Sequence, residues 1–235
     1  MTDLSPRQKA RIAGLLYLAI IVCGAFAEAF VRQRLVVPGD AAMTAANILA
    51  QEQVYRLGFV ADLIPLLLNM LLAVIFFDLF KVVNKSVAAL VVVFIVVGAA
   101  VQASALLYHL APLVLLGGDS GWRAGALTPE SLQAWALFSL KLHTSGYNIA
   151  LVFVGGYGLS LGYLIWHSTF MPRVLGVLMA VAGSLYLVNS LLSFLAPSLS
   201  SIILLLPVLL GEGGLTLWLL AFGVNPQKWK AQATS

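Results

Sequence analysis

Six long apolar segments divide the chain and decide what it can fold into. They cover residues 12–31, 57–80, 87–110, 140–166, 174–196 and 201–223. Each holds about 20 residues or more at a helical rise of 1.5 Å per residue, so each can cross about 30 Å of hydrocarbon. Inside a bilayer a single segment satisfies its backbone groups only as a helix. The sequence therefore predicts an all-α, polytopic transmembrane bundle of six spans, forming one integral membrane domain over residues 1–235.

Composition supports this class and excludes others. Hydrophobic residues make up 61% of the chain and charged residues only 9%, whereas soluble domains carry about 25% charged residues. The net charge of +4 is spread over the segment ends and forms no basic patch. We therefore expect the lipid bilayer as a partner and no nucleic acid, while the oligomeric state stays open.

The distribution of basic residues predicts the orientation. With six spans both termini lie on one side, together with eight basic residues: Arg7, Lys9, Arg11, Lys81, Lys85, Arg173, Lys228 and Lys230. The other side receives five: Arg32, Arg34, Arg56, Arg123 and Lys141. Because cytoplasmic loops are enriched in Lys and Arg, both termini are expected in the cytoplasm.

Both long loops on the expected outer side contain helix-start signals. Asp40 follows Pro38-Gly39 and is suited to cap a short helix over 41–54. Thr128 precedes Pro129 and is suited to cap a second helix that leads into the fourth span.

Five ionisable residues at membrane depth are the main functional signal. A charge there is costly and marks a functional site by default. Counting from the span ends places all five in the outer half, on five different spans: Glu28, Asp62, His109, His143 and Glu212. The pattern predicts a polar pocket that opens to the outer face, in which Glu28, Asp62 and His143 approach within about 10 Å of one another.

These residues also have structural interpretations. Glu28 and Asp62 can form ion pairs with Arg32 or Arg56, and His109, at the predicted end of the third span, can simply touch lipid headgroups. Neutral polar residues in the spans usually hydrogen-bond a neighbouring helix.

Glu212 lies nearest the membrane centre, between Gly211 and Gly213-Gly214. The glycines either interrupt the sixth span, as in helices that line binding cavities, or allow close helix packing. A carboxylate at this depth must be protonated or partnered. We expect a partner on the fourth span: His143, Tyr147 or Asn148.

Two histidines with two or three carboxylates could also hold a metal such as zinc. No HExxH pair, GxSxG serine motif or phosphate-binding glycine loop occurs in the sequence. Any metal site would therefore be assembled from separate helices, and the sequence leaves cofactors open.

Several blocks of the chain resemble a bacterial multi-pass membrane family of unknown function. They are GAFAE, GDAAMTAANI, LHTSGY, STFMPRVLG and GEGGLTLWLL, in this order along the chain. The resemblance implies a bacterial inner membrane protein and supplies no activity. It singles out six positions: Glu28, Asp40, Asp62, His143, Tyr147 and Glu212. The third span departs from the family pattern, because VVVFIVVGAA has no basic residue where other members often carry Arg.

Three functions follow from these observations. The first is binding or transport of a small molecule in the outer pocket, through Glu28, Asp62, His143, Tyr147 and Glu212. The second is an intramembrane enzyme that uses a metal or acid–base chemistry. The third is a structural or regulatory subunit whose polar residues only join helices.

Overall fold

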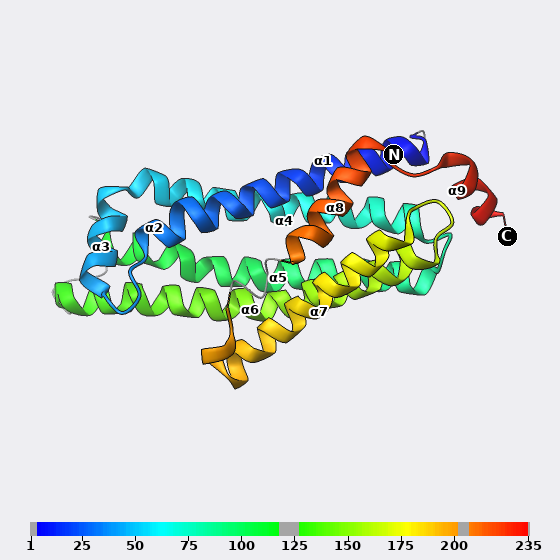
Figure 1. Cartoon of the computed structure of the whole chain (residues 1–235). Coiled ribbons are helices and arrows are strands. Elements are labelled where there is room, and N and C mark those ends of the chain that lie inside the picture. Colours follow the sequence, from blue (N-terminus) through cyan, green and yellow to red (C-terminus); the bar gives the residue numbers. More distant parts are fainter. Residues whose placement is uncertain (1–3, 118–126, 202–206, 235) are drawn as a thin grey trace. The chain divides into compact units, whose positions relative to one another are not determined.

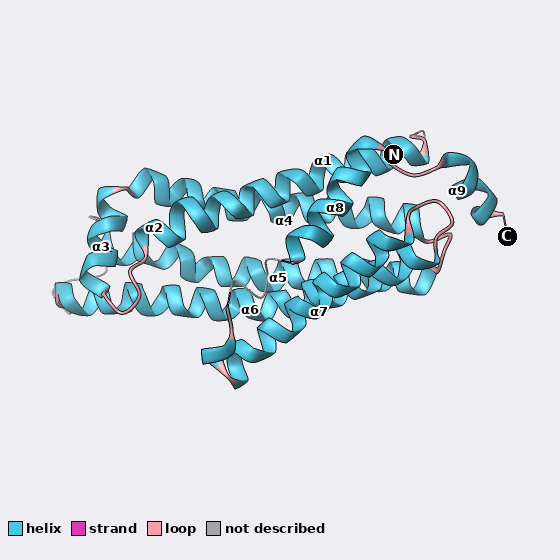
Figure 2. Cartoon of the chain, viewed as in Figure 1, coloured by secondary structure: helices cyan, strands magenta, loops and turns pink. Residues whose placement is uncertain are grey.

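The computed structural model describes residues 4–117, 127–201 and 207–234, and these parts contain helices and loops without strands (Figure 2). Figure 1 labels the helices. Their bounds are α1 Pro6–Ala25, η1 Phe26–Arg32, α2 Gln33–Leu35, α3 Ala41–Ala50, α4 Glu52–Phe80, α5 Lys85–Leu116, α6 Pro129–His167, α7 Arg173–Leu195, η2 Pro197–Leu199, α8 Val208–Ala221 and α9 Pro226–Ala233. The all-α class is confirmed.

Five of the described helical segments are long and apolar enough to cross a membrane: Pro6–Leu35, α4, α5, α6 and α7. A sixth is reached if α8 and α9, which are bent by 102° relative to each other, count as one span. The predicted sixth span, 201–223, includes residues 202–206, which lie outside the described part. The chain is thus a polytopic helical protein with five to six candidate spans.

Both predicted caps are confirmed. The Asp40 side chain accepts a hydrogen bond from the backbone N–H of Met43 at 2.8 Å, and α3 starts directly after it. Thr128 accepts from the backbone N–H of Ser131 at 3.3 Å, in front of α6. From there α6 continues for 39 residues without a break, so the capped helix and the fourth span are one element.

The chain divides into two compact units. One comprises residues 1–20, 67–100 and 148–235, and the other comprises 21–66 and 101–147. We call them the terminal unit and the central unit, after the position of their segments along the chain.

The terminal unit is built on small residues at helix contacts. A Cβ atom added to Gly158 would lie 2.9 Å from the Cα of Gly183, and one added to Gly162 would lie 2.7 Å from the carbonyl oxygen of Gly176. Helices α6 and α7 therefore approach as closely as their backbones allow, which is the usual role of glycine in membrane helix pairs. Beside them, Phe76 contacts the rings of Tyr17 and Tyr157.

The central unit has its own apolar core. Its buried members come from five elements, η1, α2, α3, α4 and α6, namely Val31, Leu35, Ile48, Tyr55 and Leu140. Through Ile48 the short helix α3 is tied into this core. Because the core joins the end of the first span to α3, α4 and α6, it holds in place the helices that carry the polar residues described next.

Candidate metal and ion-pair site

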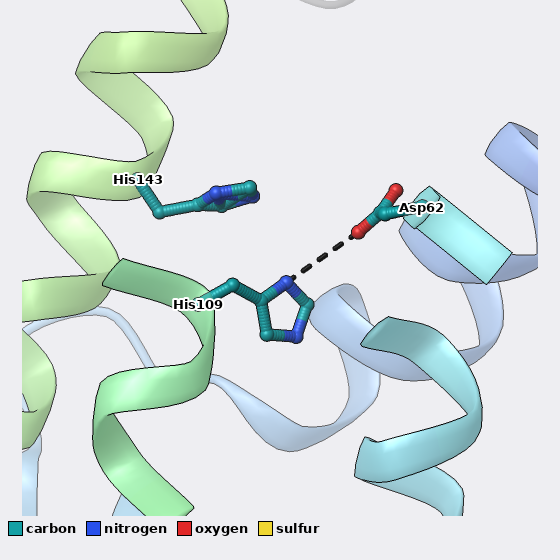
Figure 3. A group of neighbouring side chains, drawn as sticks. All are labelled: Asp62, His109 and His143. Atoms are coloured by element: carbon teal, nitrogen blue, oxygen red, sulfur yellow. Dashed lines mark ion pairs between the residues drawn. The ribbon is translucent and has the colours of Figure 1, made fainter. Parts of the chain in front are cut away.

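Asp62, His109 and His143 meet inside the central unit. They come from α4, α5 and α6, and Figure 3 shows their side chains pointing toward one another. One potential metal-ligand atom from each residue lies within 4.8 Å of the other two, and all three residues are buried. The two imidazole rings are 5.0 Å apart between centroids. Three helices thus deliver three ligand-type side chains to one point.

Two close helix contacts explain this convergence. A Cβ atom on Gly146 would lie 2.7 Å from the Cβ of Ala105, so α6 and α5 nearly touch there. His109 lies one turn beyond Ala105, and His143 lies three residues before Gly146, which places each on the face of its helix that contains the contact. The absence of a side chain at Gly146 therefore brings the two histidines together.

A second glycine brings in the first span. A Cβ atom on Gly58 would lie 2.7 Å from a methyl group of Val31, so the segment η1 lies directly against α4. Arg32 follows Val31, and Asp62 lies one turn beyond Gly58. The Arg32 guanidinium donates a hydrogen bond through Nη1 to Asp62 and a second, 2.7 Å long, through Nε to Glu28. One arginine therefore bridges two carboxylates.

The segment that carries Glu28 and Arg32 is π-helical. The backbone N–H of Gln33 donates to the carbonyl oxygen of Glu28, five residues earlier. Such i to i+5 stretches are rare and occur often at functional sites. Nothing in the hydrophobic pattern of residues 12–31 indicated it.

His109 is enclosed more completely than any other ionisable residue of the site. Its side chain is fully buried, its ring contacts Tyr55 and Phe59, and its backbone carbonyl accepts a hydrogen bond from the Tyr55 hydroxyl. Its Nδ1 faces Asp62 Oδ2 at 3.4 Å (Figure 3), which is longer than a normal hydrogen bond.

Three imidazole nitrogens lack a hydrogen-bond partner among the described residues: Nδ1 and Nε2 of His109 and Nδ1 of His143. A buried polar atom without a partner costs about 1–3 kcal/mol, and native structures rarely leave several together. Because each neutral ring carries one N–H and one lone pair, these nitrogens leave at least one lone pair, on His109, for a ligand to accept. A transition-metal ion fits this requirement.

The five predicted site residues fall into two groups. Asp62 and His143 are neighbours, and one guanidinium joins Asp62 to Glu28. Tyr147, exposed on α6, interacts electrostatically with Arg32. Glu212 belongs to the terminal unit. Whether the five residues bind a ligand stays a prediction.

The partners of Glu212 differ from those that we expected. The structure gives it hydrogen bonds with Tyr17 of α1 and Tyr186 of α7, whereas the sequence led us to expect His143, Tyr147 or Asn148. Of the two alternatives for the glycines, the structure agrees with packing rather than interruption, since α8 runs through Gly211–Gly214 without a break. A Cβ atom on Gly211 would lie 2.7 Å from the carbonyl oxygen of Leu178 on α7, so Gly211 serves helix packing.

Sequence reasoning underestimated His109 and Arg32. The third and first spans were expected to end at residues 110 and 31, which left both residues at the interface. Instead α5 continues through Pro112 to Leu116, and the first span continues to Leu35. Proline inside a membrane helix is tolerated because neighbouring groups satisfy the freed backbone. The sequence did contain a signal for Arg32, since it was one of two arginines considered as partners of Glu28 and Asp62.

One described cavity of the central unit has a volume of about 460 Å³ and lies at α3 and the adjoining ends of α5 and α6. Gln133 is the one polar residue in a lining that is otherwise apolar, and none of the five predicted site residues contributes to it. The cavity therefore differs in character from the polar pocket that we expected.

Comparison with proteins of curated function and with solved structures gave no match. A match was found with one protein family, described as a domain of unknown function, and it extends over residues 12–223, which is most of the chain. The chain therefore belongs to the DUF4386 family.

Proposed function

We propose that this protein is a metal-dependent enzyme of the bacterial inner membrane, with Asp62, His109 and His143 as the metal ligands. The observation that carries the proposal is the meeting of these three buried side chains, with their ligand atoms within 4.8 Å of one another. Catalytic zinc sites typically have three protein ligands from His, Asp or Glu and keep a fourth position for water or substrate.

The geometry needs only a small adjustment to bind zinc. Ligand atoms about 2.0–2.1 Å from a tetrahedral ion lie about 3.3 Å from one another. The present separations, of up to 4.8 Å, exceed this value by at most about 1.5 Å. Binding of an ion would favour this shortening of the distances, because coordination satisfies an imidazole lone pair that no described residue uses.

The charges also favour a cation. The carboxylates of Glu28 and Asp62 outnumber the single guanidinium of Arg32, the one guanidinium among the described residues that contacts both. Unbalanced charge in a buried site is strongly disfavoured. A divalent ion reverses the sign of this excess and leaves one positive charge.

Bound zinc would supply a hydroxide ion near neutral pH, because the ion acidifies the water that it holds. Hydrolysis is the reaction class that this supports. An ion held by Asp62, His109 and His143 would activate a water molecule for attack on a carbonyl carbon or a phosphorus atom, and the leaving group would take up the proton that this water loses. Overall, one water molecule is consumed for each bond cleaved.

Metal analysis of the protein purified in detergent tests the proposal. We expect about one zinc ion per chain after growth in zinc-containing medium, and loss of nearly all of it in His109→Ala and in His143→Ala. The matched control is His167→Ala, which alters an exposed histidine of α6, the helix that also carries His143, and should retain the metal. The wild type binding neither zinc nor cobalt, or the control losing as much metal as the site variants, would overturn the proposal.

The orientation is part of the proposal and has its own test. In a Cys23→Ser background, Gln51→Cys and Lys85→Cys place single thiols at exposed positions on opposite sides of the predicted topology. An impermeant maleimide added to intact cells should label the first and not the second. The reverse pattern would show that the termini lie outside.

A further inference from the structure

We infer that Arg32 binds an oxyanion of the substrate, so that the substrate class is a molecule carrying a phosphate or carboxylate group. The inference rests on the proposed metal site and goes beyond it, because it assigns the second half of the binding site to a residue that is not a metal ligand. Its basis is the position, the spare donors and the charge of this one side chain.

The position of Arg32 places it beside the metal ligands. Its Nη1 contacts Asp62 Oδ2, the same oxygen that faces Nδ1 of His109 at 3.4 Å. A guanidinium held there lies next to any ion bound by these residues. Metal ions and arginines that act on one anionic group from two directions are a common arrangement in phosphoryl-transfer enzymes.

The Arg32 guanidinium also has N–H donors beyond those that Glu28 and Asp62 use. It has five N–H groups, and its hydrogen bonds to the described residues Glu28 and Asp62 use two of them, one on Nε and one on Nη1. The planar arrangement of these donors matches two oxygens of a phosphate or carboxylate. With 16% of its side-chain surface exposed, Arg32 is accessible to a small anion.

The charge of the loaded site gives the sign of the ligand. With a divalent ion whose bound water has not yet ionised, the groups Glu28, Asp62 and Arg32 leave one positive charge in a largely desolvated position. A singly charged oxyanion neutralises it, and Coulomb attraction is strong where water is scarce. The site thus passes from an excess of negative charge that attracts the metal to an excess of positive charge that attracts the anion.

Glu28 provides a graded test of this inference. Its side chain is 43% exposed, so that Glu28→Gln should leave the fold intact. The substitution removes a carboxylate that competes for the guanidinium, and we expect it to tighten oxyanion binding roughly threefold or more. Arg32→Gln should weaken binding roughly tenfold, the effect of losing one charge-assisted hydrogen bond.

The probe is the cobalt-loaded protein, whose visible spectrum reports the ligands around the ion. Inorganic phosphate and, separately, acetate are added to the wild type, and the spectral change gives each dissociation constant. The ratio of the two constants shows which oxyanion the site prefers. The pair Arg56 and Glu52 is a matched control, since it is also an i, i+4 ion pair but lies on the surface. Arg56→Gln and Glu52→Gln should leave both constants unchanged.

The outcomes separate the two proposals. If the wild type gives no cobalt spectrum, the metal site and the oxyanion site both fail. If cobalt binds and neither anion changes the spectrum, or if Glu28→Gln leaves both constants at their wild-type values, only the inference about Arg32 is overturned. Tighter binding in Glu28→Gln, with no change in Glu52→Gln, supports it even if Arg32→Gln proves too unstable to purify.

Discussion

Asp62 in the central unit and Glu212 in the terminal unit are both carboxylates placed within apolar helices, and their surroundings differ in kind. Asp62 contacts a guanidinium and lies beside two histidines that have nitrogens without described partners. Glu212 is held by the hydroxyls of Tyr17 and Tyr186, and Tyr17 also accepts a hydrogen bond from Tyr157. The side chains around Asp62 include nitrogens that can still bind a ligand. The carboxylate of Glu212 already accepts hydrogen bonds from neutral hydroxyl groups.

The comparison shows that burial of an acidic residue alone does not identify a site. Depth in the membrane marked both Asp62 and Glu212 as candidate site residues. The two residues differ in whether the neighbouring side chains leave an unbalanced charge or an unused lone pair that a ligand could satisfy. The following predictions test this distinction, and they run from the largest expected effect to the smallest.

Arg32→Leu should be the most damaging substitution, because it leaves Asp62 buried without its cation. We expect a loss of about 3–5 kcal/mol in unfolding free energy for the metal-free protein. Arg56→Leu, which breaks an exposed pair, should lose less than about 1 kcal/mol. Denaturant titration in detergent measures both.

A double substitution sharpens this result. Adding Asp62→Leu to Arg32→Leu removes the orphaned charge and should recover most of the loss. Equal losses in Arg32→Leu and Arg56→Leu, or no recovery in the double variant, would mean that Asp62 does not depend on its guanidinium.

Glu212→Leu should destabilise the terminal unit without affecting metal binding. The change leaves the hydroxyls of Tyr17 and Tyr186 without their acceptor, at about 1–3 kcal/mol for each that finds no new one. Glu212→Gln keeps an acceptor and should lie close to the wild type. Zinc content should be unchanged in both variants, and a loss of zinc would show that Glu212 belongs to the site after all.

Gly211→Ala and Gly213→Ala separate packing from function within the motif around Glu212. The Cβ atom at Gly211 would meet the backbone of α7 at 2.7 Å, whereas the one at Gly213 has nothing within 4 Å. We expect Gly211→Ala to lose about 1–3 kcal/mol through overpacking. Gly213→Ala should gain up to about 1 kcal/mol from helix propensity. Thermal melting of the two variants compares them directly, and similar melting temperatures would contradict the packing role.

Asp40→Ala should have the smallest effect. It removes the cap of α3, which is worth about 1 kcal/mol, in the same unit as the proposed metal site. Metal content should stay at the wild-type level. If this mild structural change released the metal, the metal loss in His109→Ala and His143→Ala would no longer identify ligands.

Hydropathy and helix-start signals predicted most of the fold, since helix length and caps are local properties of the chain. Asp40 and Thr128 lie where their capping chemistry requires. The errors concern helix ends that packing decides. Pro112 and Arg32 both suggest the end of a span, yet α5 and the first span continue past them because neighbouring helices compensate.

The site could be predicted only in part. Similar depth correctly suggested that Asp62 and His143 meet, because polar side chains at one depth of a helix bundle tend to share the same interior space. The partners of Glu212 could not be inferred in this way. Which helices are neighbours in a bundle depends on contacts such as those of Gly58 and Gly146, and the periodicity of one sequence does not encode them.

The π-helical stretch Phe26–Arg32 makes this part of the chain sensitive to insertions and deletions. Its turns close around one more residue than those of an α-helix, so the stretch can lose a residue and rewind without breaking. Rewinding would turn the residues before it by about 100° relative to those after it. The remaining side chains would be unchanged, but Arg32 would point in a different direction relative to the residues before the stretch. Removing Ala29 should therefore be less tolerated than replacing it, and the spacing of GAFAE from Arg32 becomes a feature to compare among family members.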